Sequence, residues 1–277
     1  IMTDRYAVIG NPIDFSKSPA IHMAFARTTG QDIDYTKVLG PLGEFGPTVN
    51  TFRTAGGRGM NVTAPFKLDA FAYATERSSR AEIAGAANAL KFEADRVIAE
   101  NFDGVGLVRD VVHNLTVAMK GKRVLLLGAG GAARGAVVPF VEQQPAHLVI
   151  ANRTSAKADA LAAIARAACV DCVVDACSLE DLREQTFDLV FNATSASLRG
   201  ELPAIPMTVF REASLAYELA YGKGLTPFLR LAQNAGVVQL ADGVGMLVEQ
   251  AAEAFAWWRG VRPHTADVIR DLTIPLR

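Results

Sequence analysis

The spacing of apolar residues along the chain predicts an alternation of strands and helices. Short runs rich in Val, Ile and Leu indicate strands, whereas apolar residues three and four positions apart indicate helices. Strands are expected at 5–10, 33–39, 57–63, 86–92, 96–100, 122–128, 147–153, 187–195 and 214–221. Helices are expected at 18–30, 65–75, 107–119, 129–144, 155–168 and 242–260. Such alternation is typical of an α/β fold with largely parallel sheets.

The pattern restarts after residue 104, which indicates two domains. A chain of 277 residues also exceeds the usual size of a single domain. We expect an N-terminal α/β substrate domain formed by 1–103 plus 240–277, because the last helix should pack back on it. A Rossmann-type doubly wound dinucleotide-binding domain would occupy 104–239, with a cleft between the two domains.

Composition and charge restrict the classes of partner. Hydrophobic residues make up 50% of the chain and the formal net charge is -1, as in an ordinary globular protein. No basic stripe indicates a nucleic-acid partner, no apolar run is long enough to cross a bilayer, and no secretory signal precedes the first strand. We therefore expect a cytoplasmic protein, monomeric or homodimeric, whose partner is a small molecule and neither nucleic acid nor membrane.

The cysteines Cys169, Cys172 and Cys177 lie in one short segment. Their first spacing resembles half of a zinc site, but no second Cys or His pair follows, and the histidines are dispersed. An odd, close set is also a poor disulfide framework for a cytosolic chain. Val173 and Val174 indicate a buried strand here, so we expect reduced structural thiols and no metal.

The segment LLLGAGGAARG carries the strongest chemical signal. Gly128, Gly130 and Ala133 fit the dinucleotide fingerprint G-x-G-x-x-G/A, and the segment follows a predicted strand and opens a predicted helix, as the fingerprint requires. Gly128 permits the tight turn, and Gly130 lets the backbone approach a pyrophosphate at the helix N-terminus. A purely structural glycine-rich turn is the alternative. The expected cofactor contacts are Gly128, Ala129, Gly130, Gly131 and Ala132.

The end of the next strand indicates which cofactor is bound. An enzyme specific for NAD usually places a carboxylate there for the ribose 2′-hydroxyl. This chain has Asn152 followed by Arg153, Thr154 and Lys157. A guanidinium, a hydroxyl and an ammonium can hold a 2′-phosphate, which favours NADP, with NAD still possible. Ordinary basic surface residues are the alternative.

A nicotinamide cofactor carries a hydride, so the chain also needs a group that handles a proton. Lys67 follows the strand that ends near Thr63, at the edge of the sheet where ligands of α/β proteins gather. A lysine beside a carboxylate can relay the hydroxyl proton of an alcohol, and Asp103 is the natural partner. From the residues alone, Lys67 as a solvated helix residue and Asp103 as a turn former are equally open.

Eight segments, in order over essentially the whole chain, resemble the shikimate dehydrogenase family: GNPIDFSKSPAIH, NVTAPFK, GAANAL, ENFDGVG, GAGGAARG, NRTSAK, NATSASLRGELP and GVGMLVEQAAEAF. The resemblance implies a two-domain α/β oxidoreductase with its active site in the cleft. Its reaction would be the reversible, NADPH-dependent reduction of 3-dehydroshikimate to shikimate, a step of chorismate and aromatic amino acid biosynthesis.

The resemblance also implies a role for particular residues. Lys67 and Asp103 would form the catalytic pair. The substrate would be bound by Ser16, Ser18, Thr63, Asn88, Tyr221 and Gln250. The cofactor side would include Asn192, Thr194 and Gly243. His22 is expected to make a structural hydrogen bond, and Trp257 and Trp258 to anchor the last helix.

Three positions depart from the family's usual motifs. Phe15 precedes the SKS segment where the family usually has His, Phe102 replaces a usual Thr, and Ala89 replaces another. Reduced polar lining near the substrate loops predicts a weaker or altered substrate preference, since a lost buried hydrogen bond costs about 1–3 kcal/mol.

Two alternatives to a shikimate dehydrogenase stay open. One is a related enzyme that prefers quinate or another cyclic hydroxy acid, with either NAD or NADP as its cofactor. The other is a weakly catalytic, cofactor-binding regulatory protein. Intact Lys67 and Asp103 argue against the regulatory protein, because a pure binding module has no need of both.

Overall fold

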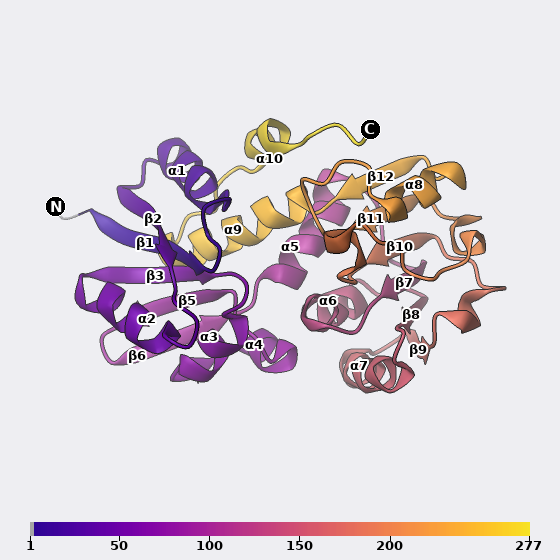
Figure 1. Ribbon diagram of the computed structural model, residues 1–277, viewed down its shortest axis with the longest axis horizontal. Helices are drawn as coiled ribbons and strands as arrows, with labels where there is room; N and C mark the ends of the chain where they lie inside the picture. Colours follow the sequence, from indigo (N-terminus) through magenta and orange to yellow (C-terminus); the bar gives the residue numbers. More distant parts are fainter. Residues whose placement is uncertain (1–2) are drawn as a thin grey trace. The chain divides into compact units, whose positions relative to one another are not determined.

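Each of the two units of the chain is built around a six-stranded sheet (Figure 1). The computed structural model describes residues 3–277. Unit 1 comprises the described residues up to Gly106 together with 248–270, and unit 2 comprises 107–247 together with 271–277. The expected α/β fold with two sheets and a Rossmann-type second half is confirmed.

Unit 1 contains a mixed sheet. Its strands, in chain order, are β1 (Asp4–Gly10), β2 (Ile33–Leu39), β3 (Gly57–Val62), β4 (Glu76–Arg77), β5 (Ala89–Glu93) and β6 (Arg96–Glu100). Their spatial order is β2-β1-β3-β5-β6-β4. The first three pair in parallel, whereas β5 runs antiparallel to both β3 and β6. The helices wholly in this unit are α1 (Ser18–Thr29), α2 (Phe45–Thr54), α3 (Lys67–Tyr73) and α4 (Ser79–Ala84).

Unit 2 contains a sheet that is parallel throughout. Its strands are β7 (Arg123–Leu127), β8 (His147–Ala151), β9 (Val173–Cys177), β10 (Leu189–Asn192), β11 (Leu215–Glu218) and β12 (Gln239–Asp242). Its α-helices are α6 (Gly131–Glu142), α7 (Ser155–Ala168) and α8 (Pro227–Asn234), and its 3-10 turns are Glu180–Leu182, Ala196–Arg199 and Met207–Phe210. The spatial order β12-β11-β10-β7-β8-β9 reverses direction between β10 and β7. In doubly wound sheets this reversal marks the ligand-binding edge.

Both faces of the unit 2 sheet are covered, as its apolar strands predict. Val124 and Leu126 of β7 belong to a core with α6 and α7. Leu125 and Leu127 belong to a second core with α8. Successive side chains of a strand point to opposite faces, so a strand that is apolar at every position can serve two cores.

Three helices contain residues of both units: α5 (Asp103–Arg109), α9 (Val244–Arg259) and α10 (Ala266–Leu272). α5 continues into a π-helical turn at Asp110–Asn114. α5 and α9 approach closely at Gly106, where a Cβ would lie 2.7 Å from the backbone nitrogen of Gln250. Glycine is therefore required at position 106, because any side chain would push the two helices apart.

The structure differs from the expected boundaries at two helices. α3 begins at Lys67 rather than at residue 65, because Phe66 N–H closes a turn on the Thr63 carbonyl at 3.0 Å. The helix expected at 107–119 begins at Asp103 and ends near Asn114. The pattern missed α2, β4, α4, α8, β12 and α10. In α2, internal Gly and Pro residues lower the helix propensity, so tertiary packing decides its conformation.

Buried aromatic rings surround His22 in α1. Its imidazole stacks on Tyr35 with ring centroids 4.3 Å apart, and its centroid lies 5.5 Å from that of Trp258 in α9. Within residues 3–277, neither ring nitrogen makes a hydrogen bond of good geometry, and the polar side chain beside the ring is that of Asn61. Packing holds this ring in place. Burial lowers the pKa of His22 to about 3, against a smaller opposing effect of the neighbouring Asn61 side chain.

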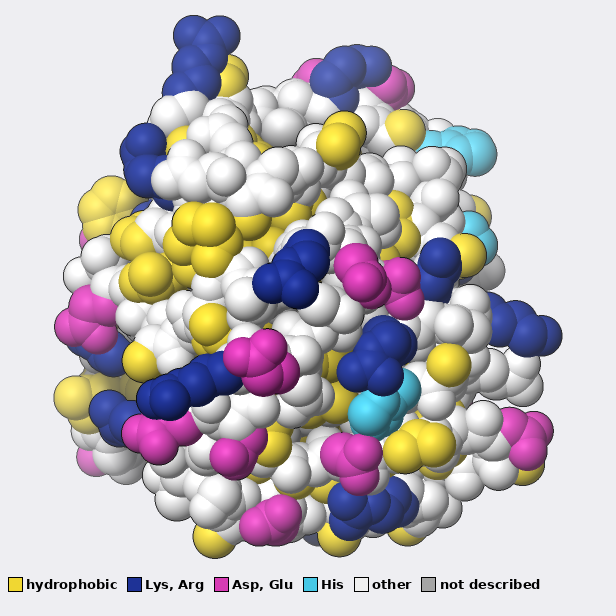
Figure 2. Space-filling model, turned by 90° about the vertical axis from the view of Figure 1, so that its right-hand side faces the viewer, with side chains coloured by type: hydrophobic (Ala, Val, Ile, Leu, Met, Phe, Trp, Pro, Cys, Tyr) yellow, Lys and Arg dark blue, Asp and Glu magenta, His cyan; other side chains and the backbone are white. Residues whose placement is uncertain are grey.

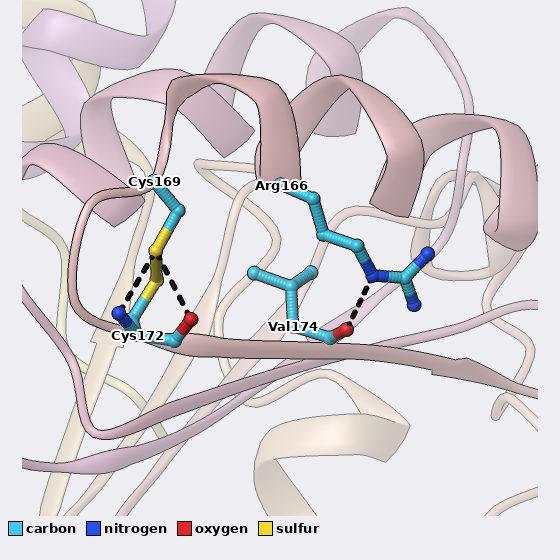
Figure 3. The surroundings of a disulfide bond; sticks show 4 residues. All are labelled: Arg166, Cys169, Cys172 and Val174. Atoms are coloured by element: carbon cyan, nitrogen blue, oxygen red, sulfur yellow. Dashed lines mark hydrogen bonds between the residues drawn. A yellow bond between two sulfur atoms is a disulfide. The ribbon is translucent and has the colours of Figure 1, made fainter.

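The expectation of three reduced thiols is wrong for two of them. Cys169 and Cys172 form a disulfide where the chain turns back from α7 toward β9, with their Cα atoms 6.0 Å apart (Figure 3). Arg166 Nε also fastens this turn by donating to the Val174 carbonyl at 2.8 Å. Sequence spacing gave no indication that the turn brings the two sulfur atoms together. Cys177 is free, and burial raises its pKa to about 11.

Charges of both signs are scattered over the face drawn in Figure 2, between patches of apolar side chains. No extended surface of a single charge sign is visible there. Among residues 3–277, no helix is both long and apolar enough to span a bilayer.

We predict that the free energy of unfolding falls as the pH drops from 6.5 to about 4.5. The unfolded imidazole of His22 binds a proton at its usual pKa of 6.5, whereas the folded one does so only near 3. Stability is therefore complete above 6.5 and decreases by about 3 kcal/mol over two pH units. Urea unfolding followed by circular dichroism at several pH values measures the slope. His22→Phe keeps an aromatic ring without a titrating group, so identical slopes in both proteins would contradict the prediction.

Candidate active site

An ion pair joins the first residue of α3 to the first residue of α5. Lys67 Nζ lies 2.7 Å from Asp103 Oδ2, and the two side chains retain 37% and 17% of their exposure. Partial burial makes the attraction stronger than in bulk water, while the exposed part leaves the ammonium accessible to a reacting group. The two residues that were expected to act as a pair are therefore in contact.

The buried amide of Asn88 connects this ion pair to α9 and to the residue that precedes α5. Asn88, just before β5, donates from Nδ2 to Asp103 Oδ1 at 3.0 Å and to Gln250 Oε1 of α9 at 3.1 Å. Its Oδ1 accepts from the N–H of Phe102 at 2.9 Å. These three bonds fix which way the amide faces. Lys67, Asp103, Asn88 and Gln250 thus form one continuous network within unit 1.

The loop before Asp103 is held by residues that the sequence did not single out. Asn101 Oδ1 accepts from the Asp103 N–H at 3.1 Å, and its Nδ2 donates to the Ala86 carbonyl at 3.1 Å. The Asn101 N–H donates to Glu100 Oε1 at 2.8 Å, and Arg80 binds both oxygens of Glu100 at 3.1 and 2.8 Å. Only the clustering of polar residues in ENFDG could have indicated this support.

The two phenylalanines that depart from the family motifs have opposite surroundings. Phe15 is 86% exposed, whereas Phe102 is 3% exposed and packs with Ala89, Ala254 and Trp257. A ring buried to that degree offers almost no surface to a ligand. The structure therefore does not support the expectation that the Phe102 ring narrows the substrate pocket.

Further polar groups lie at the ends of β1 and β3. Ser16 Oγ accepts from the N–H of Ser18 at 3.3 Å, where α1 begins. Tyr35 Oη donates to Asn61 Oδ1 at 2.6 Å, and burial raises the pKa of Tyr35 well above its usual value, which keeps it a neutral donor. The buried Nδ2 of Asn61 has no partner within residues 3–277. This nitrogen is buried, and the Asn61 side chain neighbours the His22 imidazole, so Asn61 belongs to the packing behind the site; Thr63 directly follows β3.

The glycine-rich turn follows β7 in unit 2. Gly128 has a φ of 107°, and a Cβ there would lie 3.0 Å from the Ala193 carbonyl, just beyond β10. A Cβ at Gly130 or Gly131 would meet nothing of the described chain within 4 Å. The residue that precedes α6 is a glycine, so it has no side chain to cap the first N–H groups of the helix. Open space and uncapped donors at the reversal of strand order suit the pyrophosphate of a dinucleotide.

The basic residues expected to bind a 2′-phosphate follow β8. Arg153 lies in the segment that leads into α7 and Lys157 in the first turn of the helix, and the neutral Asn152 and Thr154 belong to the same expected set. Asn152 Nδ2 donates to the Thr154 carbonyl at 3.0 Å, which shapes this segment. Glu201 pairs with Arg199 at 2.9 Å, and Arg199 and, to a smaller degree, Arg153 lower its pKa. The Glu201 carboxylate thus neutralises Arg199 and lies within electrostatic range of Arg153.

Asn192 ends β10 and orders the loop behind it. Its Oδ1 accepts from the N–H and the hydroxyl of Thr194 at 3.1 and 2.7 Å, and its Nδ2 donates to Glu218 at 3.2 Å. Glu218 is fully buried and also accepts from Ser197 and from Thr226. Burial raises the pKa of Glu218, and these hydrogen bonds oppose the rise. The Asn192 amide is thus engaged internally and acts by holding Thr194 in place.

Tyr221 and Gly243 complete the expected set. Tyr221 lies after β11 and is 43% exposed. Gly243, before α9, would have a Cβ only 2.1 Å from the Leu219 carbonyl, so no other residue fits. Both belong to unit 2, so Tyr221 is separated in this division from the other expected substrate-binding residues, which belong to unit 1.

Family models match most of the chain in three consecutive pieces. The substrate binding domain of shikimate dehydrogenase matches residues 8–90. The shikimate / quinate 5-dehydrogenase model matches residues 110–199, and the C-terminal domain of shikimate 5′-dehydrogenase matches residues 243–271.

Individual proteins match over nearly their whole length. The shikimate dehydrogenase (NADP(+)) of Aromatoleum aromaticum is 55% identical, over 97% of this chain and 96% of its own. The crystal structure of an Ael1 enzyme from Pseudomonas putida, 58% identical, covers 99% of this chain and 100% of its own, with a TM-score of 0.96. The shikimate 5-dehydrogenase of Thermus thermophilus, in complex with NADP(H) and shikimate, is 30% identical with a TM-score of 0.84, and the match covers 98% of this chain and 100% of its own.

We predict that Asn88→Ala lowers the free energy of unfolding by about 1–3 kcal/mol, because the Phe102 N–H and the Gln250 oxygen lose their buried partner. Asn50→Ala is the matched control, since Asn50 is exposed and accepts its hydrogen bond at the surface. Urea unfolding of both variants measures the difference. Equal stability of the two variants would mean that the Asn88 amide is not a structural hub.

Proposed function

The chain belongs to the shikimate dehydrogenase family, and we propose that it catalyses the reversible reduction of 3-dehydroshikimate to shikimate with NADPH. The ion pair between Lys67 and Asp103 carries this proposal, because it places a proton-bearing group beside a carboxylate on a rigid support. The NADP-dependent relatives named above support the choice of cofactor.

Unit 1 supplies the substrate-binding groups in this proposal. Asn88 is bonded both to Gln250 and to Asp103, so the side chains of Asn88 and Gln250 have fixed positions beside the proposed catalytic pair. The hydroxyls of Ser16 and Ser18 bind the substrate carboxylate, and Thr63 adds a further donor. Tyr221 is proposed as a further substrate-binding residue.

Lys67 handles the proton. In the reductive direction its ammonium donates a proton to the carbonyl oxygen that becomes the hydroxyl, and the amine takes the proton back in the oxidative direction. The Asp103 carboxylate accepts a hydrogen bond from the lysine ammonium at 2.7 Å and so holds it in place. Asn88 fixes the second carboxylate oxygen, which prevents Asp103 from rotating away.

The residues of unit 2 fit a dinucleotide phosphate. The turn from Gly128 to Ala132 and the first N–H groups of α6 would hold the pyrophosphate, and Arg153, Thr154 and Lys157 the 2′-phosphate. Thr194 and Gly243 would line the nicotinamide side. The nicotinamide ring supplies or accepts the hydride when the cofactor is bound.

We predict that Lys67→Ala lowers kcat for shikimate oxidation by about 10²- to 10⁴-fold, the usual contribution of a general acid or base. NADP affinity should stay unchanged, because the cofactor residues belong to unit 2. Arg58→Ala is the control, since Arg58 also forms an ion pair, with Asp4 at 3.2 Å, at an exposed position outside the network. Steady-state kinetics and cofactor titration by fluorescence give both quantities. Undiminished turnover would dismiss Lys67 as the proton donor.

We predict that the wild-type protein oxidises shikimate faster with NADP than with NAD. Arg153→Ala should raise the KM for NADP by about 10- to 100-fold, because the 2′-phosphate loses one charge-assisted hydrogen bond. The KM for NAD, which has no 2′-phosphate, should stay almost unchanged. Arg230→Ala, at an exposed position of α8, is the control. A preference for NAD in the wild-type protein would refute the assignment of this site.

The same kinetic measurements, extended to quinate and other cyclic hydroxy acids, distinguish the alternatives. A higher kcat/KM for quinate would favour the quinate-type enzyme. NADPH binding without turnover of any of these acids would favour the regulatory protein.

A further inference from the structure

Phe102 anchors the start of α5 in a small apolar cluster. The cluster consists of Ala89 and Ala254, both fully buried, the Phe102 ring, and the partly buried Trp257 and Trp258. The rings of Phe102 and Trp257 meet edge to face, with centroids 5.7 Å apart at 71°. The guanidinium of Arg80 lies 5.5 Å from the centre of the Phe102 ring and is itself held by Glu100. The ring is thus packed from several directions.

The apolar cluster and the polar network share two pairs of adjacent residues. In the first pair, Asn88 belongs to the network and Ala89 to the cluster. In the second pair, Asp103 belongs to the network and Phe102 to the cluster. In each pair, one side chain therefore belongs to the polar network and the adjacent one to the apolar cluster. A shift of the peptide unit between the two residues of a pair displaces both of them, because that unit is rigid.

Backbone hydrogen bonds make this coupling tight. The Phe102 N–H donates to Asn88 Oδ1 at 2.9 Å, and the Phe102 carbonyl accepts from the Gly106 N–H at 2.9 Å in the first turn of α5. The adjacent Asp103 N–H donates to Asn101 Oδ1 at 3.1 Å. The ring, the amide of Asn88 and the helix start therefore fix the same peptide unit.

We propose that Phe102 is a positioning residue for the reaction: its buried ring holds Asp103, and through Asp103 the Lys67 ammonium, in the reactive geometry. The proposal rests on the proposed function. It assigns the ring no contact with the substrate. Because the neighbouring residues 89 and 254 are alanines, neither of their side chains can fill the space that loss of the ring would open.

The first experiment compares Phe102→Ala and Phe102→Leu by steady-state kinetics with shikimate and NADP. Phe102→Ala should lower kcat by about 10- to 100-fold, the effect of a misplacement of about 1 Å, with KM for shikimate changed much less. Phe102→Leu fills most of the space and should recover kcat to within about threefold of wild type. The ratio of kcat/KM for shikimate and quinate should stay constant in both variants. A changed ratio would mean that the ring contacts substrate, and would overturn the proposal.

Phe52→Ala is the matched control for lost packing. Phe52 is buried in α2, meets Phe92 edge to face and has the guanidinium of Arg5 5.8 Å from its ring centre, as Phe102 has Trp257 and Arg80. This variant should lose stability like Phe102→Ala but keep the wild-type kcat at temperatures where it remains folded. An equal loss of kcat in both variants would show a general effect of core packing and overturn the proposal.

A double-mutant cycle tests whether Phe102 acts through Asp103. In the Asp103→Asn background, Phe102→Ala should lower kcat by less than about twofold, because the pair that it positions is already lost. A loss as large as in the wild-type background would mean that the ring acts by another route, and would overturn the proposal.

Amide hydrogen exchange gives a readout that does not depend on activity. In Phe102→Ala the amides of residues 102 and 103 should exchange at least about tenfold faster, while the Gly128 amide, bonded to Ala151 in unit 2, keeps its protection. Unchanged protection at 102 and 103 would overturn the proposal. If the wild-type protein does not oxidise shikimate but exchange responds as expected, the proposed function fails and the positioning by the ring stands.

Discussion

The hydrogen bonds of Asn88 are the constraint on which the rest of unit 1 depends. Its side chain binds the Phe102 N–H, Asp103 and Gln250, while its backbone binds the Val62 N–H at 2.8 Å and the Glu100 carbonyl at 3.0 Å. One buried residue thereby joins β3, the end of β6, α5 and α9. Because an unpaired buried amide costs free energy, the folded state favours the arrangement that also places Lys67 beside Asp103.

Unit 2 also has a buried asparagine, at the edge of its sheet where the cofactor is proposed to bind. Asn192, buried at the end of β10, binds Thr194 on one side of its amide and the buried Glu218 on the other. Parallel strands end at one edge of a sheet, where loops must be ordered without help from the strand ladder. A buried asparagine suits this place, because one planar group presents both donors and acceptors to two neighbouring segments.

Beside the proposed catalytic pair, adjacent residues divide between the apolar cluster and the polar network. Phe102 and Ala89 were expected to alter the substrate pocket, but both lie in the apolar cluster with Ala254. A large ring opposite two alanines preserves the filled volume, and the polar network next to it stays complete. Departures from a family motif at these positions therefore bear on how the network is supported. Phe15, by contrast, is exposed and has no comparable role in packing within residues 3–277.

Local patterns in the sequence determined the α/β class, the strand and helix order, the glycine-rich turn and the basic residues after β8. These features depend on neighbours in sequence, where periodicity and turn chemistry act directly. Only the tertiary structure decided that Lys67 meets Asp103 and that Cys169 bonds Cys172. It also decided that, within residues 3–277, the Nδ2 of Asn61 and the ring nitrogens of His22 have no partner. Those outcomes depend on burial and on contacts between distant segments. The direction of the Phe102 ring likewise depends on the tertiary structure, because the space available to a side chain is set by neighbours that are distant in sequence.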